Sequence, residues 1–295
     1  LAPFLIGRDA DSVEDLHDEM RWQIHYVGRG GVSAFAIGAL DVALWDIRGK
    51  ATGKSLSKMA GGASDRCKAY GGGIDLNFTI PKLLENVDGF LARGHNAVKI
   101  KVGREDLQED VERVRAVRAH IGSDILLMVD ANYGLDVASA IDAARAFEEF
   151  HLTWFEEPID PDDFEGYRKI SKETGIPVAA GENCHSTHDF ELLAKTGALQ
   201  YLQPDGGTCG GITTWLRAAK IADRNGISVC SHGMQELHVS LLAGWPNSGW
   251  LEVHSFPIDQ YTSRPLVVED HLAVAPKLPG IGVSFDWGRL AEYEA

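Results

Sequence analysis

The stretch AVKIKVG (residues 97–103) is a short run of apolar and β-branched residues that predicts a buried β-strand. Two lysines, Lys99 and Lys101, interrupt it. Because successive side chains of a strand point to opposite faces, both ammonium groups lie on one face. Burying one unpaired charge is costly, and a second like charge beside it raises the cost. The neighbouring strands must therefore supply groups that compensate the two positive charges on this face.

A similar unit recurs along the chain from residue 66: a short apolar run ends in polar residues, and a helical pattern follows. The runs are CKAYGGGI (67–74), AVKIKVG (97–103), ILLMVDAN (125–132), TWFEEP (153–158), IPVAAGEN (176–183), LQYLQPDGG (199–207), GISVCSHG (226–233) and GWLEVHS (249–255). Segments such as EDVERVRAVRAHIG (109–122) and ASAIDAARAFEEF (138–150) have helical periodicity. Alternating β and α units predict a parallel sheet covered by helices.

Eight such units match a (β/α)₈ barrel, whose usual length is about 250 residues. An open, doubly wound sheet is the alternative, although GGGID (71–75) does not match the G-x-G-x-x-G dinucleotide fingerprint. We expect residues 66–255 to form the barrel. Residues 1–65 differ, with two predicted helices (12–24 and 33–49), and residues 256–295 predict a β-rich tail that packs on another layer.

Composition excludes several classes of partner. The chain has 295 residues, of which 44% are hydrophobic, so it can bury a large core. A formal net charge of −15 argues against nucleic acid or an anionic membrane as partner. No apolar run reaches the roughly 18 residues of a membrane span, and no signal-peptide pattern is present. Four scattered cysteines without C-x-x-C are typical of reduced thiols, so we expect a cytoplasmic protein.

Ionisable groups end every predicted strand from the second onward, and active sites of barrels lie at this end of the strands. In strand order, these polar residues are Lys99 and Lys101, Asp130 and Asn132, Glu156 or Glu157, Glu182, Asp205, His232 and Glu252.

Three consecutive strands each contribute a carboxylate: Asp130, then Glu156 or Glu157, then Glu182. Three carboxylates in a dry barrel mouth cannot all ionise unless a cation joins them. Hard oxygen ligands without Cys or His suit Mg²⁺. Each acid alone would be read as a solvated strand end or a helix cap, and the series of three favours a metal. Strand alternation leaves Glu156 only slightly ahead of Glu157.

Candidate acid and base groups flank this predicted metal site. Lys99 and Lys101 would face the carboxylates, and two adjacent ammonium groups lower each other's pKa, so one could act as a base. The alternative is that both lysines only neutralise carboxylates. On the far side, a bond from Asp205 would fix the tautomer of His232 and raise its basicity. The remaining candidate histidines, for which we expect structural or surface positions, are His185, His188, His238 and His254.

The ordered motifs KIK, VDAN, FEEP, GEN, PD, SHG and WLE resemble the mandelate racemase subgroup of the enolase superfamily over about residues 20–290. The resemblance implies a (β/α)₇β barrel with an α+β capping domain. Residues 1–65 would be a partial capping domain that lacks its β-meander, and residues 256–295 would pack back on it. Specificity loops belong to the missing part, so the substrate is not readable. The family also implies a homo-oligomer.

The resemblance also implies roles for the strand-end residues. Asp130, Glu156 and Glu182 would bind Mg²⁺, which selects the first glutamate of FEEP. Lys101 would be a base on one face of a small carboxylate substrate, with Lys99 beside it near the carboxylate and the metal.

His232, paired with Asp205, would be the acid/base group on the other face of the substrate. Glu252 would hydrogen-bond the substrate carboxylate, and Asn132 would contact a substrate hydroxyl. The expected reaction is abstraction of the proton α to a carboxylate, followed by dehydration of a sugar acid (an aldonate or aldarate) to a 2-keto-3-deoxy acid.

Three alternatives to dehydration remain. A racemase or epimerase of an α-hydroxy acid and a sugar-lactone cycloisomerase would need the same groups. A catalytically silent barrel is the non-enzymatic alternative, and the full set of ionisable strand ends speaks against it.

Overall fold

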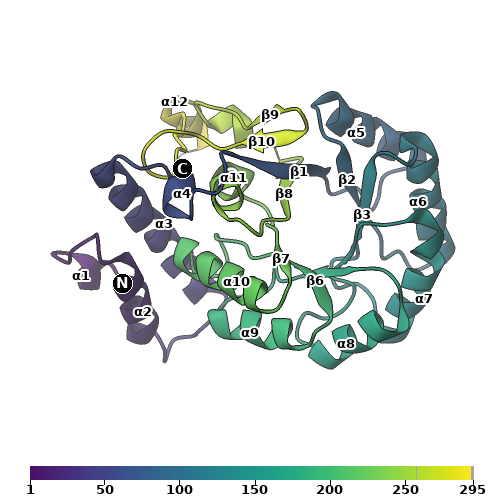
Figure 1. Cartoon of the computed structure of the whole chain (residues 1–295), viewed down its shortest axis with the longest axis horizontal. Helices are drawn as coiled ribbons and strands as arrows, with labels where there is room; N and C mark the ends of the chain where they lie inside the picture. Colours follow the sequence, from purple (N-terminus) through teal and green to yellow (C-terminus); the bar gives the residue numbers. More distant parts are fainter. Residues whose placement is uncertain (257, 294–295) are drawn as a thin grey trace.

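Eight parallel strands form a closed barrel in this computed structural model, which describes residues 1–256 and 258–293 (Figure 1). The strands are β1 (Arg66–Gly72), β2 (Ala97–Lys101), β3 (Leu126–Asp130), β4 (Phe155–Glu156), β5 (Val178–Ala180), β6 (Leu199–Leu202), β7 (Ser228–Val229) and β8 (Trp250–His254). Strands β1 to β7 pair in sequence order, and β8 pairs with β1. A bridge between Val229 and Ser248 joins β7 to the start of β8, which closes the ring and excludes an open sheet.

One helix follows each of the first seven strands. These helices are α5 (Ile80–Ala92), α6 (Leu107–Ile121), α7 (Val137–Phe147), α8 (Phe164–Glu173), α9 (Thr187–Lys195), α10 (Ile212–Arg224) and α11 (Gln235–Gly244). Four of them begin at a side chain that accepts a hydrogen bond from a backbone amide of the first turn, the usual N-cap: Asp106, Asp136, Asp163 and Ser186. These caps fix where the four helices begin.

The chain after β8 departs from the eightfold repeat. In the described residues it forms a hairpin of β9 (Val267–Glu269) and β10 (Leu272–Val274) instead of a barrel helix, and β10 pairs antiparallel with the start of β1. The prediction of a (β/α)₈ barrel is therefore wrong for the eighth unit, in which the β9–β10 hairpin replaces the helix. The (β/α)₇β architecture that the family resemblance implied is confirmed.

The barrel interior is layered. An inner apolar layer contains Tyr70, Ala97, Met128, Trp154, Ala179, Cys230 and Trp250. On β2, β3 and β4, the next inward residue lies two positions further along and is Lys99, Asp130 or Glu156. Outward side chains such as Val98 and Val129 belong to the larger core under the helices. The apolar layer thus fills the barrel below the polar residues and excludes water from that side.

The N-terminal helices contact the barrel. They are α1 (Ala2–Leu5), α2 (Val13–Gln23), α3 (Val32–Thr52) and α4 (Leu56–Met59), so the predicted helices 12–24 and 33–49 are confirmed. A Cβ atom on Gly38 of α3 would lie 3.1 Å from the amide nitrogen of Gly211, so α3 packs directly on the loop after β6. Asp41 of α3 accepts hydrogen bonds from the amide (2.8 Å) and hydroxyl (2.6 Å) of Thr213.

The C-terminal segment contacts both the barrel and the N-terminal helices. Beyond β10, Gly280 accepts a hydrogen bond from the amide of Leu56 (2.8 Å), and the amide of Ile281 donates to Asp46 (3.0 Å). From these contacts we propose a division of the chain into 1–65, 66–255 and 256–295. Residues 257 and 294–295 lie outside the described part. None of the described helices has both the length and the apolar character that a membrane span requires.

Candidate active site

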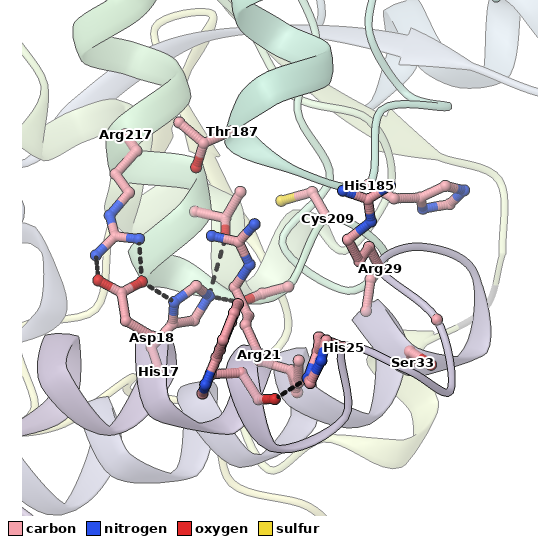
Figure 2. A pocket seen from close by; sticks show the side chains of 16 residues that line it. His17, Asp18, Arg21, His25, Arg29, Ser33, His185, Thr187, Cys209 and Arg217 are labelled. Carbon is pink, nitrogen blue, oxygen red and sulfur yellow. Dashed lines mark hydrogen bonds and ion pairs between the residues drawn. The ribbon is translucent and has the colours of Figure 1, made fainter.

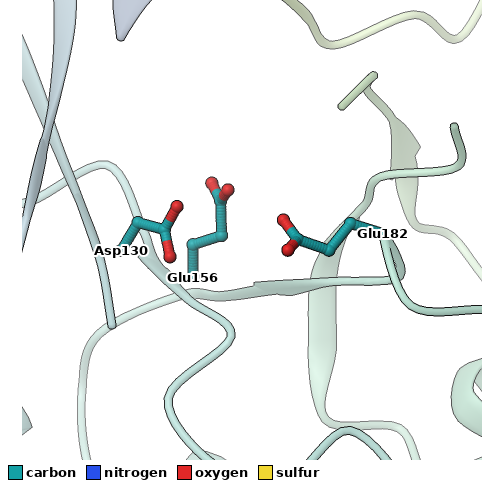
Figure 3. A group of neighbouring side chains, drawn as sticks. All are labelled: Asp130, Glu156 and Glu182. Carbon is teal, nitrogen blue, oxygen red and sulfur yellow. The ribbon is translucent and has the colours of Figure 1, made fainter. Parts of the chain in front are cut away.

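Three carboxylates meet at the carboxyl ends of neighbouring strands (Figure 3). One oxygen each from Asp130, Glu156 and Glu182 lies within 4.8 Å of the other two. Asp130 and Glu156 are fully buried, and burial raises the pKa of Glu156 to about 8. Oε2 of Glu182 is buried and has no hydrogen-bond donor among the described residues. Converging hard oxygen atoms, one of them without a partner, fit a divalent cation such as Mg²⁺.

Glu157 lies outside this cluster, which resolves the ambiguity in WFEEP. Its side chain accepts hydrogen bonds from the amide of Gly181 (2.9 Å) and the hydroxyl of Tyr167 (3.0 Å). Strand β4 ends at Glu156, and Glu157 has a φ of +39°. The chain therefore turns at this residue and directs the second glutamate away from the barrel axis.

Lys99 and Lys101 face the carboxylates and are buried. The ammonium group of Lys99 contacts Glu156, Glu252 (2.9 Å) and Asp130 (3.3 Å), and that of Lys101 contacts Asp130 (2.5 Å). We expected the lysines to lower each other's pKa, and for Lys99 this is wrong. Burial does lower the pKa of Lys99, but the surrounding carboxylates raise it well above the ordinary value.

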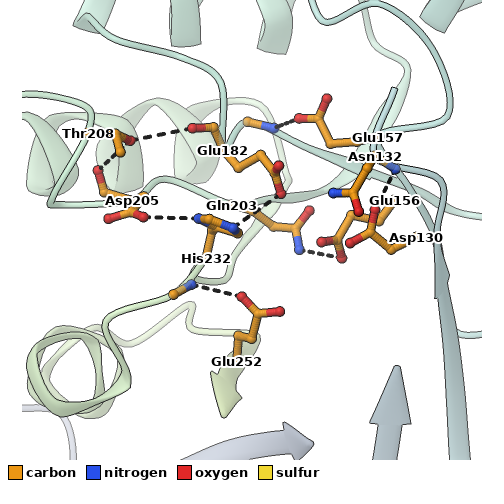
Figure 4. Close-up of polar contacts among 12 residues, drawn as sticks. Asp130, Asn132, Glu156, Glu157, Glu182, Gln203, Asp205, Thr208, His232 and Glu252 are labelled. Carbon is orange, nitrogen blue, oxygen red and sulfur yellow. Dashed lines mark hydrogen bonds and ion pairs between the residues drawn. The ribbon is translucent and has the colours of Figure 1, made fainter. Parts of the chain in front are cut away.

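His232 and Asp205 form a hydrogen-bonded pair on the other side of the carboxylates (Figure 4). Nδ1 of His232 lies 3.0 Å from Oδ2 of Asp205, and Nε2 lies 3.6 Å from Oε2 of Glu182. Burial alone would lower the pKa of His232, but the bond to Asp205 and the nearby carboxylates of Glu252 and Glu182 raise it to about 10. The imidazole thus presents a proton on Nε2 to the centre of the site.

Glu252 and Asn132, which with Lys99 are the predicted substrate contacts, differ in their surroundings. Glu252 is buried between Lys99 and the amide of Gly233, which donates to it at 2.8 Å. Burial would raise the pKa of Glu252, but Lys99 and His232 hold it well below the usual range. Asn132 is exposed and has a φ of +43°. Since β3 ends at Asp130, strand alternation does not place Asn132 on the same face as Asp130. The backbone amide of Asn132 donates to Oδ1 of Asp130 at 2.8 Å.

Two residues at the centre of the site were not singled out in the sequence. The indole N–H of Trp154 and the amide group of Gln203 each donate to Oε2 of Glu156, at 2.8 Å. Strand alternation could have found Trp154, which lies two residues before Glu156, but Gln203 lies beyond the end of β6 at Leu202, where alternation no longer applies.

The remaining histidines do not join the cluster. His238 is buried; its Nδ1 pairs with the carbonyl of Gly233 (2.7 Å), and its Nε2 accepts from the amide of Gly206 (2.9 Å). This histidine therefore ties the loop after β7 to the loop after β6.

A separate cavity of about 620 Å³ lies between α2, α3 and the loops after β5 and β6 (Figure 2). It is lined by Asp18 and Arg217, which pair at 2.6 Å, and by His17, whose Nε2 lies 3.0 Å from the hydroxyl of Thr214. None of the predicted site residues lines it. The cavity marks the junction of the N-terminal helices with the barrel.

Comparison with known proteins agrees with this geometry. Residues 82–289 match the family model described as enolase C-terminal domain-like, and residues 1–61 match the mandelate racemase/muconate lactonizing enzyme N-terminal domain. A 3,6-anhydro-alpha-L-galactonate cycloisomerase of Streptomyces coelicolor is 43% identical over 97% of this chain and 79% of its own length. An L-talarate/galactarate dehydratase of Salmonella typhimurium is 35% identical over 85% of this chain and 64% of its own length.

Solved structures show the same relationship. A racemase from Streptomyces coelicolor with bound magnesium has a TM-score of 0.94 at 42% identity and covers 97% of this chain and 79% of its own. An L-talarate dehydratase from Polaromonas, complexed with Mg and L-glucarate, has a TM-score of 0.94 at 36% identity and covers 99% of this chain and 78% of its own. The chain therefore belongs to the enolase superfamily, within its mandelate racemase/muconate lactonizing enzyme group.

Proposed function

We propose that this protein removes the proton α to the carboxylate of a sugar acid and eliminates the β-oxygen, which yields a 2-keto-3-deoxy acid. The observation that carries the proposal is the row of Asp130, Glu156 and Glu182 with Lys101 at one end and the His232–Asp205 pair at the other. Proton transfer on both faces of one substrate requires such a two-sided arrangement. Relatives named as sugar-acid dehydratases and cycloisomerases support the same chemistry.

The carboxylate row would hold Mg²⁺. When bound, the ion would supply positive charge that stabilises the negative charge developing on the substrate carboxylate after proton loss. Trp154 and Gln203 would orient Glu156 toward the ion, since both donate to the same oxygen of that carboxylate. The apolar layer beneath keeps water from that side of the ligands.

The side chains then divide the proton transfers between them. Lys101, in its neutral form, would accept the α-proton at Nζ. His232, protonated and oriented by Asp205, would donate its Nε2 proton to the β-oxygen as the carbon–oxygen bond breaks, so that dehydration releases one water. Lys99 would contact the substrate carboxylate, Glu252 would hydrogen-bond to it in its protonated form only, and Asn132 would contact a substrate hydroxyl.

A cycloisomerase is the second candidate, and the 43% identical relative favours it. A 3,6-anhydro sugar acid carries a ring ether oxygen on the carbon β to its carboxylate. The same two proton transfers would then break the ring bond, and the oxygen would stay in the product. A racemase or epimerase is a third candidate, in which His232 returns a proton to the α-carbon on the opposite face.

The test combines two assays on a panel of aldonates, aldarates and anhydro sugar acids with saturating Mg²⁺. Keto-acid formation reports elimination, and deuterium incorporation at the α-carbon in D₂O reports proton abstraction. We expect His232→Asn to abolish keto-acid formation while exchange by Lys101 continues, and Lys101→Met to abolish exchange on its own face. His188→Asn, on an exposed residue of α9, is the matched control.

Each other outcome points to one alternative. Exchange without keto acid would favour the racemase. A keto acid from an anhydro acid only would favour the cycloisomerase. An absence of exchange with every acid tested would favour a catalytically silent barrel.

A further inference from the structure

A buried ion pair that the proposed chemistry does not use lies directly beside Lys101. Asp75, in the loop after β1, is fully buried, and Arg113, in the middle of α6, is 2% exposed. Their charged groups are 3.1 Å apart. A buried ion pair contributes little net stability, because the loss of hydration offsets the attraction. The backbone groups that this pair contacts therefore explain its position better than its net stability does.

The ion pair replaces strand-to-strand hydrogen bonding where the β1–β2 ladder ends. The last paired residues of these strands are Gly72 and Lys99, so β1 offers no ladder partner to Lys101. The amide of Lys101 donates instead to Oδ1 of Asp75 at 2.9 Å, and the carbonyl of Lys101 accepts from Arg113 at 3.3 Å. Both backbone polar groups of Lys101 are thus held by one ion pair.

The same guanidinium group also fixes the loop that carries its partner. Arg113 donates to the carbonyl oxygens of Asp75 (3.0 Å) and Phe78 (2.8 Å). Lys101 is held from the other side by β3, where it pairs with Asp130. Its Cα position is therefore determined by β3 on one side and by the Asp75–Arg113 pair on the other.

We propose that Asp75 and Arg113 are positioning residues that clamp the backbone of Lys101 and thereby place its amine for α-proton abstraction. The inference rests on the proposed role of Lys101 as a base. Proton transfer requires a near-attack geometry, and a displacement of about 1 Å can cost on the order of 100-fold in rate. His232 is on β7–α11 and makes no contact with the pair, so the clamp acts on one face of the substrate only.

The test is Arg113→Met, which keeps the length of an apolar stem and removes the donors. Arg115→Met is the matched control, because Arg115 is on the same helix but is exposed; it pairs with Glu149 at 3.4 Å and lies over the ring of Phe150. For Arg113→Met we expect α-proton exchange on the Lys101 face to fall about 10- to 100-fold. The imidazole titration of His232 in NMR, which reports on the other face of the site, should stay unchanged, and Arg115→Met should change neither quantity.

A second measurement does not depend on activity. Backbone hydrogen–deuterium exchange of the peptide 97–103, followed by mass spectrometry, should accelerate in Arg113→Met and remain unchanged in Arg115→Met. If Arg113→Met does not fold, the double variant Asp75→Asn/Arg113→Met removes both charges and leaves neither buried alone; the same two results are expected for it.

The outcomes separate the clamp from the proposed function. A shift of the His232 titration in Arg113→Met, together with the loss of exchange, would overturn the clamp and indicate a general structural role. Unchanged protection of 97–103 would also overturn it. A wild-type protein without exchange on any acid would refute the proposed base, and with it the positioning role, even if loss of protection showed that the pair holds the strand.

Discussion

His232 lies between two carboxylates of different elements: its Nδ1 is 3.0 Å from Asp205 and its Nε2 is 3.6 Å from Glu182. Asp205 follows β6 and Glu182 follows β5, and the imidazole of His232, in the loop after β7, lies close to both of these neighbouring strand ends. This placement raises the pKa of His232 to about 10 despite burial. The residue is therefore protonated at neutral pH, the state that a general acid requires.

Asp205→Asn should lower the pKa of His232, because it removes the largest of the effects that raise it. The folded-state pKa lies above the unfolded value of about 6.5. The stabilisation by protonated His232 is therefore fully present below about pH 6.5 and is lost as the pH rises through about 10. We expect the stability gap between wild type and variant to shrink over that interval, as measured by urea unfolding, and the imidazole titration in NMR to move to lower pH. Asp142→Asn, on an exposed position of α7, should show neither effect.

The barrel was readable from the sequence because its units are local. Each predicted strand is a short apolar run, each helix has its own periodicity, and several begin at an Asp or Ser cap such as Asp106. The last unit was missed by periodicity alone, because the pairing of β10 with β1 joins residues about 200 positions apart. Such a long-range pairing leaves no local pattern in the chain.

The site was readable only in part, because strand alternation applies only as far as the strand continues. It placed Lys99 and Lys101 correctly on one face, but it did not decide between Glu156 and Glu157, since β4 ends there. The pKa of Lys99 was misjudged because it depends on three carboxylates from other strands. Nothing in the sequence of α6 reveals that Arg113 has a buried partner in the loop after β1.

Glu182→Gln should weaken Mg²⁺ binding on the order of 100-fold or more, because the change removes one anionic ligand and its charge while preserving shape. Isothermal titration with Mg²⁺ measures the affinity directly. The rise in melting temperature at a fixed Mg²⁺ concentration should also shrink, as mass action requires. Glu165→Gln, with an exposed side chain on α8, is the control. Unchanged Mg²⁺ affinity would remove Glu182 from the proposed ligand set.

Trp154→Phe should weaken Mg²⁺ binding by about 10-fold, the lower end of the usual effect of a residue that orients a metal ligand. The variant loses one of the two hydrogen bonds to Oε2 of Glu156 and keeps that of Gln203. Trp215→Phe is a matched control: Trp215 is equally buried, and its indole N–H has no partner among the described residues. Both variants should lose comparable stability in urea. An equal loss of Mg²⁺ affinity in both would show that packing, and not the hydrogen bond, is responsible.

Asp41→Asn should alter the pH dependence of stability, because burial raises the pKa of Asp41 from 3.8 to about 7. Between these values the folded protein binds the proton and the unfolded chain does not, so this group lowers the stability as the pH rises from about 4 to about 7. The asparagine has no such titration and can still accept from Thr213. Relative to wild type, the variant should gain stability between pH 5 and pH 8, by at most about 1.4 kcal/mol per pH unit. Urea unfolding at the two pH values measures the change, with Asp15→Asn on the exposed side of α2 as control. Parallel pH profiles of wild type and variant would mean that Asp41 stays ionised where α3 meets the loop after β6.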